Sequence, residues 1–478
     1  MSELFDAVIT GSGPNGISTA IYLQKKGLKT VIFEQASTPG GSVRTEELTL
    51  AGFKHDIGSA IHPMAYASPF LRKLPLEDHG LKWIFPEIPY TQVLSDGGAV
   101  ACYRDIKATA DQLGEDAASY IHLFESLTKS WPKIEKDLLG PLTWPDDPVE
   151  FLKFGLRAFP SARFFANHNF KKEKTKLFFY GAAAHSTLPL TNIASASFGL
   201  VLSIMAHKYG WPFPEGGASG LTNALISYYK SLGGEIRLNE KISDLKQLPE
   251  SDSYLFDLTP RQILSIKNIE LSSTYKKRLQ KYNYGAGVFK IDWALEEPIP
   301  WLNDKCRRSG TVHIGYSTEE IEKSESDIHA NRLNNIPYVL LAQNSVFDTT
   351  RAPVGKQTAW AYCHVPNGNI ADQTAAIEDQ IEKAAPGFRK IILARNTYTT
   401  RQLEHFNPNI IGGDINGGKQ DITQLFTRPV AKLDPYATSN PKIFICSSST
   451  PPGGGVHGMC GYHAARSAFK FLDKSKRI

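Results

Sequence analysis

Two apolar runs of strand length enclose a glycine-rich turn and a helical pattern at the beginning of the chain. Residues 4–10 are mostly apolar and lead into residues 11–16, which contain three glycines. Apolar residues then recur at helical spacing until Gly27, and a second apolar run covers residues 28–33. Short uninterrupted apolar runs are typical of strands that are buried on both faces of a parallel sheet. The pattern therefore predicts a strand, a turn, a helix and a strand, in that order.

The rest of the chain alternates between helical and strand-like patterns. Residues 105–205 contain several helix-forming runs, whereas residues 284–295 and 338–344 are typical of strands. Near the carboxy terminus, the apolar run at residues 442–446 precedes a glycine-rich loop and an alanine-rich helical pattern. Such alternation favours sheets that are covered by helices. We therefore expect an α/β protein with a second domain of mixed helices and strands.

The first glycine turn has the spacing G-x-G-x-x-G. Gly11 permits the tight turn, Gly13 lets the backbone approach a pyrophosphate, and Gly16 lets the helix pack closely on the strand. Glu34, 18 residues beyond Gly16, ends the second strand, where an acid can accept hydrogen bonds from a ribose diol. A glycine turn alone is weak evidence, but the complete unit predicts a dinucleotide site. The acid at Glu34 disfavours the 2′-phosphate of NADP.

Two further glycine-rich segments favour FAD over NAD. Gly40 and Gly41 form a flexible turn just beyond the ribose position, and the planar guanidinium of Arg44 suits phosphate oxygens. A surface hairpin with a solvated arginine is the alternative interpretation. The second segment, residues 453–458, is a glycine-rich loop between a strand and a helix, where backbone amides can approach a flat ring or a phosphate. A simple NAD dehydrogenase needs neither segment, so we expect FAD held by both ends of the chain.

Composition and charge exclude several classes of protein. The chain has 478 residues, of which 41% are hydrophobic and 21% charged, and its net charge of +5 is spread along the chain, so no nucleic-acid partner is indicated. The five cysteines include no CxxC pair, and the histidines are not grouped at metal-ligand spacing, so we expect no redox dithiol and no metal. No signal peptide is visible, and serines interrupt the longest apolar stretch. We therefore expect a cytoplasmic or organelle-matrix protein that is at most peripheral on a membrane.

The glycine-rich blocks together resemble the phytoene-desaturase-type flavoproteins of the amine-oxidase-like superfamily. The matching blocks are residues 11–58, 214–236, 412–414 and 452–458. Within this group the chain is most similar to the poorly characterised pyridine nucleotide-disulphide oxidoreductase-domain subgroup. The marks of that subgroup are Asp-Leu-Thr-Pro at residues 257–260, where carotenoid desaturases usually carry an Asn-Ala-Asp-Pro-like turn, and a cysteine in Gly-Met-Cys-Gly. The resemblance is specific for FAD binding and much less specific for the substrate.

The resemblance implies a doubly wound, Rossmann-like FAD-binding domain built from discontinuous segments, with an α+β substrate domain. We expect the FAD-binding domain at residues 1–65, 205–265 and 400–478, and the substrate domain at residues 66–204 and 266–399. The residues predicted to bind FAD are Gly11, Ser12, Gly13, Pro14, Asn15, Gly16, Glu34, Gln35, Gly40, Gly41, Ser42, Arg44, Gly58, Ser59, Ala60, Ile242, Ser449, Gly455, Val456, His457 and Gly458.

Three histidines are candidates for chemistry beyond cofactor binding. His62 follows the block that the resemblance places beside the isoalloxazine ring, where an imidazole can adjust the flavin or move a proton. His457 lies in the carboxy-terminal loop, where it is better explained as a residue that satisfies backbone groups. His185 lies in a helical stretch of small residues, so it either lines a substrate pocket or packs within the helix layer. Our candidate catalytic residue is His62.

Residues 151–179 combine eight phenylalanines with seven basic residues. Apolar anchors beside cations suit a segment that lies on a membrane surface, from which a lipophilic substrate would reach the flavin directly. A set of core-facing helices with a solvated basic face is the alternative interpretation. The sequence leaves both interpretations open.

These observations support a phytoene dehydrogenase-like, FAD-dependent oxidoreductase. It would remove hydride from a small, extended and largely apolar substrate and pass the electrons to oxygen, a quinone or another carrier. Flavin amine oxidation is an alternative in the same fold. A flavoprotein that mainly binds a regulatory partner, with little turnover, is the alternative of another class. The substrate, the electron acceptor and the oligomeric state stay open.

Overall fold

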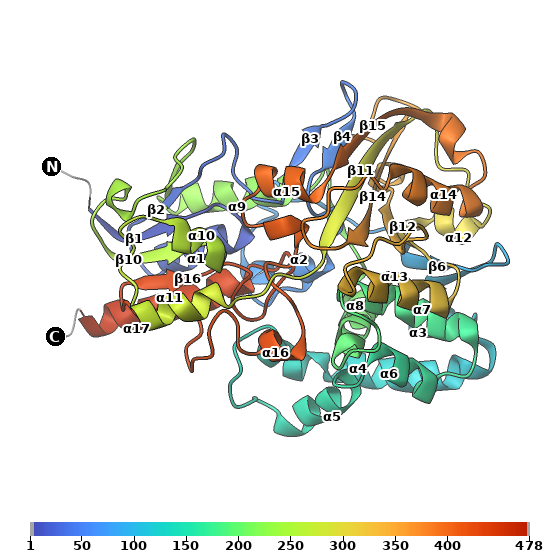
Figure 1. Ribbon diagram of the computed structural model, residues 1–478, viewed down its shortest axis with the longest axis horizontal. Helices are drawn as coiled ribbons and strands as arrows, with labels where there is room; N and C mark the ends of the chain where they lie inside the picture. Colours follow the sequence, from blue (N-terminus) through green and yellow to red (C-terminus); the bar gives the residue numbers. More distant parts are fainter. Residues whose placement is uncertain (1–3, 476–478) are drawn as a thin grey trace.

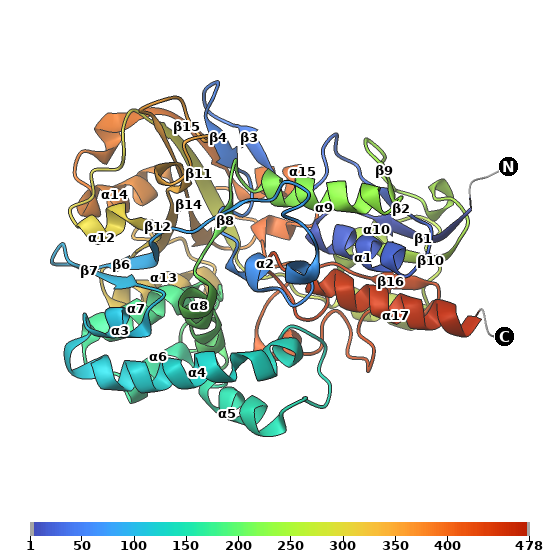
Figure 2. The ribbon, with the colours of Figure 1, turned by 180° about the vertical axis from the view of Figure 1, so that it is seen from behind.

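The computed structural model describes residues 4–475 and has two lobes, each built around one main sheet (Figure 1). One lobe contains a five-stranded sheet and both ends of the chain, and the other contains a seven-stranded sheet with a layer of helices beneath it. Seen from behind, the last helix of the chain lies beside the first helix (Figure 2). The two termini therefore belong to the same lobe.

The five-stranded sheet is entirely parallel and buried. Its order is β16 (Ile443–Ile445), β10 (Ser251–Phe256), β1 (Phe5–Thr10), β2 (Thr30–Phe33) and β9 (Glu235–Arg237). Helices cover both faces. On one face the apolar strand residues pack with α1 (Pro14–Lys25), α9 (Ser219–Ser231) and α17 (Met459–Ser475), and on the other with α10 (Pro260–Ser265) and α11 (Ser273–Gln280). This arrangement confirms the predicted doubly wound α/β class.

Helices α1 and α17 pack closely because both present small residues to their contact. A Cβ on Gly461 would overlap the Asn15 carbonyl oxygen, and the buried Ala464, Ala465 and Ala468 continue the same side of α17. The short side chains let the first and last helices of the chain lie against one another on the same sheet.

The seven-stranded sheet forms the second lobe. Its order is β15 (Ile392–Tyr398), β11 (Gly287–Leu295), β14 (Gln357–Val365), β13 (Val339–Ala342), β12 (Ser309–Ile314), β6 (Ile88–Val93) and β7 (Ala99–Cys102). All neighbouring strands are antiparallel except β12 and β6. Two small antiparallel pairs connect the lobes: β3 (Thr45–Glu47) with β4 (Lys54–Asp56), and β5 (Trp83–Ile84) with β8 (Phe213–Pro214).

Alternation along β11 gives the mixed sheet two different faces. Phe289, Ile291 and Trp293 join an apolar core with α14 (Thr374–Ala384). Successive side chains of a strand point to opposite faces, so Val288 and Lys290 face the other way. That second face forms part of the cavity described below.

The remaining helices lie mainly around the mixed sheet. The α-helices are α2 (Pro63–Ala67), α3 (Ile106–Ala110), α4 (Ala117–Leu138), α5 (Pro148–Ala158), α6 (Ala162–Asn169), α7 (Glu173–Ala184), α8 (Ser195–Tyr209), α12 (Asp304–Arg307), α13 (Thr318–His329), α15 (Thr400–Phe406) and α16 (Ile422–Leu425). The 3₁₀ turns are η1 (Leu71–Lys73), η2 (Gly114–Asp116), η3 (Leu245–Gln247), η4 (Asn344–Val346), η5 (Phe388–Ile391) and η6 (Ile411–Gly413). Within residues 4–475, no helix is both long and apolar enough to cross a bilayer.

The strands of each sheet come from separate parts of the chain. Those of the parallel sheet lie within residues 5–33, 235–256 and 443–445, inside the three segments expected for the FAD-binding domain. Those of the mixed sheet lie within residues 88–102 and 287–398, inside the segments expected for the substrate domain. The exact residues at which one domain gives way to the other stay a prediction.

The phenylalanine-rich segment mostly contributes to the core. Five of its aromatic side chains are buried between α5, α6, α7 and α8: Phe154, Phe165, Phe170, Phe178 and Phe179. Its clustered lysines pair with acids, Lys171 and Lys172 with Glu115 and Lys176 with Glu173. For most of these residues the core-facing interpretation therefore holds, because the helices bury their aromatic side against one another.

Candidate active site

A cavity of about 460 Å³ joins the two lobes. One part is lined by the first glycine turn, at the carboxyl ends of β1 and β2, and another by the face of the mixed sheet that contains Val288 and Lys290. Ligands of open α/β sheets bind at this edge of the strands. A single cavity therefore connects a dinucleotide-type site with the floor of the second lobe.

Glu34 directly follows β2 and organises the first turn. Its Oε2 accepts hydrogen bonds from the amide of Ser12 at 2.9 Å and from the Ser12 hydroxyl at 2.6 Å, and its Oε1 accepts one from the Ala36 amide at 2.8 Å. The side chain is buried and lines the cavity. The position suits ribose binding, although Glu34 also holds the turn together.

Asp257 directly follows β10 and lies at the amino terminus of α1. Its Oδ2 accepts a hydrogen bond from the Gly16 amide at 3.0 Å, and a Cβ on Gly13 would approach the same oxygen to 2.6 Å. Burial, reinforced by the charge of Glu34, raises the pKa of Asp257 to about 7. The Asp257 carboxyl group therefore lies at the same helix terminus whose amides can bind phosphates.

The second glycine turn lies directly against the first. A Cβ on Gly41 would come within 3.2 Å of the Gly13 Cα, so this approach depends on glycine. Arg44 donates a hydrogen bond to the Gly41 carbonyl at 3.0 Å, and its guanidinium stacks over Phe406 at 4.2 Å. Arg44 lines the cavity with its guanidinium held by neighbours rather than free in solvent.

The carboxy-terminal loop reaches the same cavity through Gly455 and Val456. Gly455 has φ +122°, a conformation that residues with side chains rarely adopt. His457 is buried, and its Nδ1 accepts a hydrogen bond from the Met459 amide at 3.0 Å, at the start of α17. This contact matches the expectation that His457 satisfies backbone groups.

The predicted cofactor residues divide into two groups. Those that line the cavity are Gly11, Ser12, Gly13, Pro14, Asn15, Glu34, Gln35, Gly41, Ser42, Arg44, Gly58, Ser59, Ala60, Ile242, Gly455 and Val456. Those that lie behind it are Gly16, Gly40, Ser449, His457 and Gly458. The glycines of the second group permit close packing instead, since a Cβ on Gly16 would overlap the Gly11 carbonyl oxygen.

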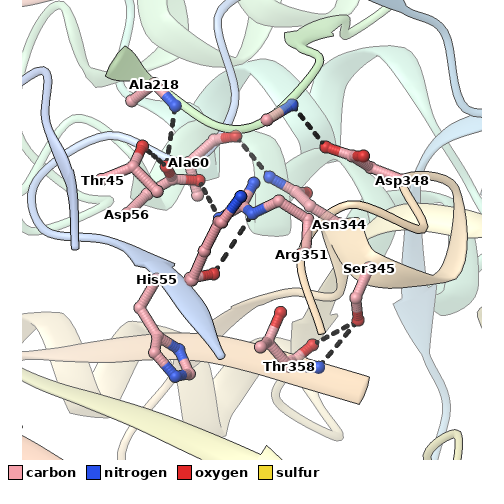
Figure 3. A network of polar contacts seen from close by, with 12 residues as sticks. Thr45, His55, Asp56, Ala60, Ala218, Asn344, Ser345, Asp348, Arg351 and Thr358 are labelled. Atoms are coloured by element: carbon pink, nitrogen blue, oxygen red, sulfur yellow. Dashed lines mark hydrogen bonds and ion pairs between the residues drawn. The ribbon is translucent and has the colours of Figure 1, made fainter. Parts of the chain in front are cut away.

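A buried polar network joins the lobes beside the cavity (Figure 3). The Nη2 atom of Arg351 donates to Asp56 Oδ2 at 2.8 Å, and Asp56 Oδ1 accepts hydrogen bonds from the Thr45 hydroxyl and the Ala218 amide. Asn344 donates to the Ala60 carbonyl at 2.7 Å. The segment that contains Gly58, Ser59 and Ala60 is thus held from both sides.

His62 lies at the amino end of α2, buried, and lines the cavity. Neither of its ring nitrogens has a hydrogen-bond partner among the described residues. Burial lowers the pKa of His62 to about 4, so its imidazole is neutral near pH 7.

No group of three or more His, Cys, Asp or Glu residues in the described part of the chain could hold a metal ion.

The floor of the cavity contains residues that sequence reasoning missed. Pairing across β12, β13, β14 and β11 aligns Thr311, Ala342 and Trp360 in one row, and Leu340, Tyr362 and Lys290 in the next. All six line the cavity. Lys290 is buried and paired with Asp292. The alternation of strand residues 284–295 hinted at two faces, but only the strand register brings these residues together.

The cavity and the fold define a flavoprotein. Residues 15–265 match the model of the flavin-containing amine oxidoreductase family, and the chain belongs to that family. It is an oxidoreductase of the flavin-dependent type.

Known proteins resemble the chain over almost its whole length. A rat protein, pyridine nucleotide-disulfide oxidoreductase domain-containing protein 2 (Rattus norvegicus), is 23% identical, and the match covers 98% of this chain and 94% of the rat protein. A lycopene-forming phytoene desaturase from Pseudescherichia vulneris is 22% identical over 98% of this chain and 99% of its own. The crystal structure of an oxidoreductase from Methanosarcina mazei has the same fold, with a TM-score of 0.65, 15% identity and coverage of 97% and 99%. The predicted family resemblance is confirmed.

Proposed function

We propose that the chain binds FAD without a covalent bond and removes hydride from an extended, largely apolar substrate, as a dehydrogenase of the phytoene-desaturase type. The observation that carries this proposal is the single cavity that joins the glycine turns with the floor of the mixed sheet. When bound, the flavin would supply the oxidising chemistry, and the protein would supply binding and orientation.

The residues around the first lobe fit FAD. The amino terminus of α1 offers amides to a pyrophosphate. Asn15 Oδ1 and Thr10 Oγ1, both from cavity-lining residues, are buried without a partner in the part of the chain that the structure describes. Glu34 would hold the ribose. Gly455 and Val456 would lie along the ring system, where the absence of a side chain on Gly455 leaves room.

The second lobe would hold the substrate. Leu340, Tyr362 and Trp360 form an apolar floor, and Lys290 adds one amine, beside Asp292. Burial lowers the pKa of Lys290 even though Asp292 opposes the shift. Lys290 would orient a water or a substrate oxygen at this end of the floor. The electrons would leave to oxygen, a quinone or another carrier.

Amine oxidation is the alternative that the family description supports. A role as a binding partner with little turnover is the alternative of another class. Neither has a particular observation in its favour at the cavity floor, where apolar side chains predominate.

We also propose that substrate is delivered from a membrane surface. The outward side of α5 exposes Val149, Leu152 and Leu156, and the adjoining loop exposes Leu142 and Trp144. The exposed fraction of Trp144 is 85%. Contiguous apolar exposure of this kind marks an interaction site, and Lys153 and Arg157 on the same helix would face anionic lipid headgroups. This face replaces the buried phenylalanines as the candidate anchor.

Two measurements test the main proposal. Flavin released from purified protein by heat should be FAD at about one per chain. Anaerobic titration with extended apolar compounds should then bleach the flavin absorption. Release of NAD without flavin would contradict the proposal that the cofactor is FAD. Bleaching of the flavin by primary amines alone would favour amine oxidation.

A further inference from the structure

The far end of the substrate floor contains two histidines in direct contact. His185 follows α7 and lines the cavity, and its Nε2 lies 3.0 Å from Nε2 of His313 on β12. The His185 ring also meets the cavity-lining Trp211 edge-on, with 5.7 Å between ring centroids. His313 is fully buried and stacks on Tyr90. The position of the His185 ring is therefore fixed from two sides.

Strand register places this pair relative to the rest of the cavity. His313 is opposite Leu340, Leu340 is opposite Tyr362, and Tyr362 is opposite Lys290. Three strand spacings separate His313 from Lys290, a distance of about 14 Å across the sheet. An extended ligand that begins near Lys290 would therefore reach His185 with its other end.

The pair leaves one ring nitrogen of His185 for a ligand. Its Nε2 is committed to His313, and its Nδ1 has no partner anywhere in residues 4–475. Burial, with a smaller contribution from the charge of His364, lowers the pKa of His185 to about 3, and burial also lowers the pKa of His313. Both imidazoles are therefore neutral near pH 7, and the two share a single hydrogen between their Nε2 atoms.

This sharing makes the Nδ1 of His185 adaptable. If His185 donates to His313, its Nδ1 is an acceptor, whereas if His313 donates to His185, the same Nδ1 carries a proton and donates. The pair can thus meet a hydroxyl through an accepting Nδ1 or a carbonyl oxygen through a donating Nδ1. It provides no negative charge for an ammonium. Asp414, a carboxylate that also lines the cavity, directs its oxygens to the backbone amides of Gly285 and Asn416.

We propose that His185, supported by His313, determines specificity by receiving an uncharged oxygen group, a hydroxyl or a carbonyl, on an otherwise apolar substrate. This inference rests on the proposed function for the position of the substrate. Two residues that line the floor also have a buried polar atom without a partner within residues 4–475, Thr311 Oγ1 and Trp360 Nε1, which supports a ligand with more than hydrocarbon character.

Binding of a matched ligand series to the purified protein tests the proposal. The probes are 1-decanol, 2-decanone, decane and decylammonium at pH 7, and their affinities are measured by displacement of a bound apolar fluorescent dye. A purely apolar cavity would bind decane best, because the oxygen of the others would lose its water without compensation. We expect decanol and decanone to bind at least as tightly as decane, and at least tenfold more tightly than decylammonium.

Variants of His185 test whether this residue causes the preference for oxygen-containing ligands. In His185→Phe the decanol-to-decane affinity ratio should fall at least tenfold, and His185→Gln should restore part of it. His207→Phe is the matched control, because His207 is buried and hydrogen-bonded to Tyr120 but does not line the cavity. Tighter wild-type binding of decane than of decanol and decanone, tighter binding of decylammonium than of decanol, or an unchanged ratio in His185→Phe would overturn the proposal. The ratios need no flavin reduction, so failure of the proposed function would instead appear as missing FAD or absent bleaching.

Discussion

Arg351 and Asp56 form an ion pair of 2.8 Å that is buried on both sides, with side-chain exposures of 3% and 2%. Burial opposes ionisation of Asp56, but Arg351, the Ala218 amide and the Thr45 hydroxyl together hold its pKa below the usual value. The pair links β4, which leads into the cavity-lining residues 58–60, to the loop that follows η4 of the second lobe.

Removal of Arg351 should leave an uncompensated carboxylate in the interior. We expect Arg351→Met to lower the free energy of unfolding in urea by about 3–5 kcal/mol. The exposed pair of Arg308 with Glu87 is the control, and Arg308→Met should leave the free energy of unfolding almost unchanged. Because the folded pKa of Asp56 is depressed, its contribution to stability is present above its unfolded pKa and should be lost as the pH falls through the folded value. Equal effects of the two substitutions would contradict this account.

Asp257 should make the folded state less stable as the pH rises, which is the opposite of the effect expected for Asp56. Its pKa rises from 3.8 to about 7 in the folded chain, so the folded state prefers the protonated carboxyl. The resulting stabilisation is complete below the unfolded pKa and is lost as the pH rises toward about 7. Asp257→Asn should flatten this dependence in urea unfolding measured at several pH values, whereas Asp252→Asn, at an exposed position of β10, should leave it unchanged. An identical pH profile for Asp257→Asn would refute the assignment.

Glu34 should contribute to FAD affinity through charge-assisted hydrogen bonds. Glu34→Ala should weaken binding by about 2–3 kcal/mol. Equilibrium dialysis of FAD measures the change, and Glu47→Ala, at an exposed position of β3, is the control. Part of the loss would come from the turn itself, because Glu34 binds Ser12. Unchanged affinity would show that the carboxylate does not reach the ribose.

Gly455→Val should reduce the amount of FAD bound per chain, whereas the control substitution described below should not. The φ of Gly455 is +122°, and a Cβ there would meet the His457 ring at 3.1 Å. Gly355→Val is a matched control with φ +81° and open space around the new Cβ. Both substitutions strain the backbone, but of the two glycines only Gly455 lines the cavity. Full flavin content and an unshifted absorption spectrum in Gly455→Val would place the loop away from the ring.

The exposed apolar residues of α5 and the loop before it should bind the protein to anionic vesicles. Wild-type protein should float with phosphatidylserine-containing liposomes, and the triple substitution of Trp144, Leu152 and Leu156 by serine should abolish flotation. Leu302→Ser, at another exposed apolar position, is the control. Raised salt should weaken the association only in part, because apolar insertion is less sensitive to screening than charge attraction. Absence of wild-type flotation would remove the proposed delivery route.

Local pattern was enough to predict the dinucleotide half of the site. The strand at residues 5–10, the glycine turn and Glu34 are close in sequence, and each depends on backbone geometry that the residue types themselves impose. The contribution of the carboxy-terminal loop was predictable from the same kind of strand, glycine and helix pattern. These features determined the fold class and the family.

Only the tertiary structure determined the other half of the site and which apolar side chains are exposed. Asp257 reaches the Gly16 amide across 241 residues, and Lys290 and His185 enter one cavity only through the register of the mixed sheet and the packing of α7 against it. Burial likewise separated phenylalanines such as Phe165 and Phe178 from the exposed Leu152 and Leu156, which have the same apolar character in the sequence. Side-chain type specifies what a residue can do, but the neighbours that bury, pair or expose it come from distant segments, and their arrangement depends on how the sheets and helices pack.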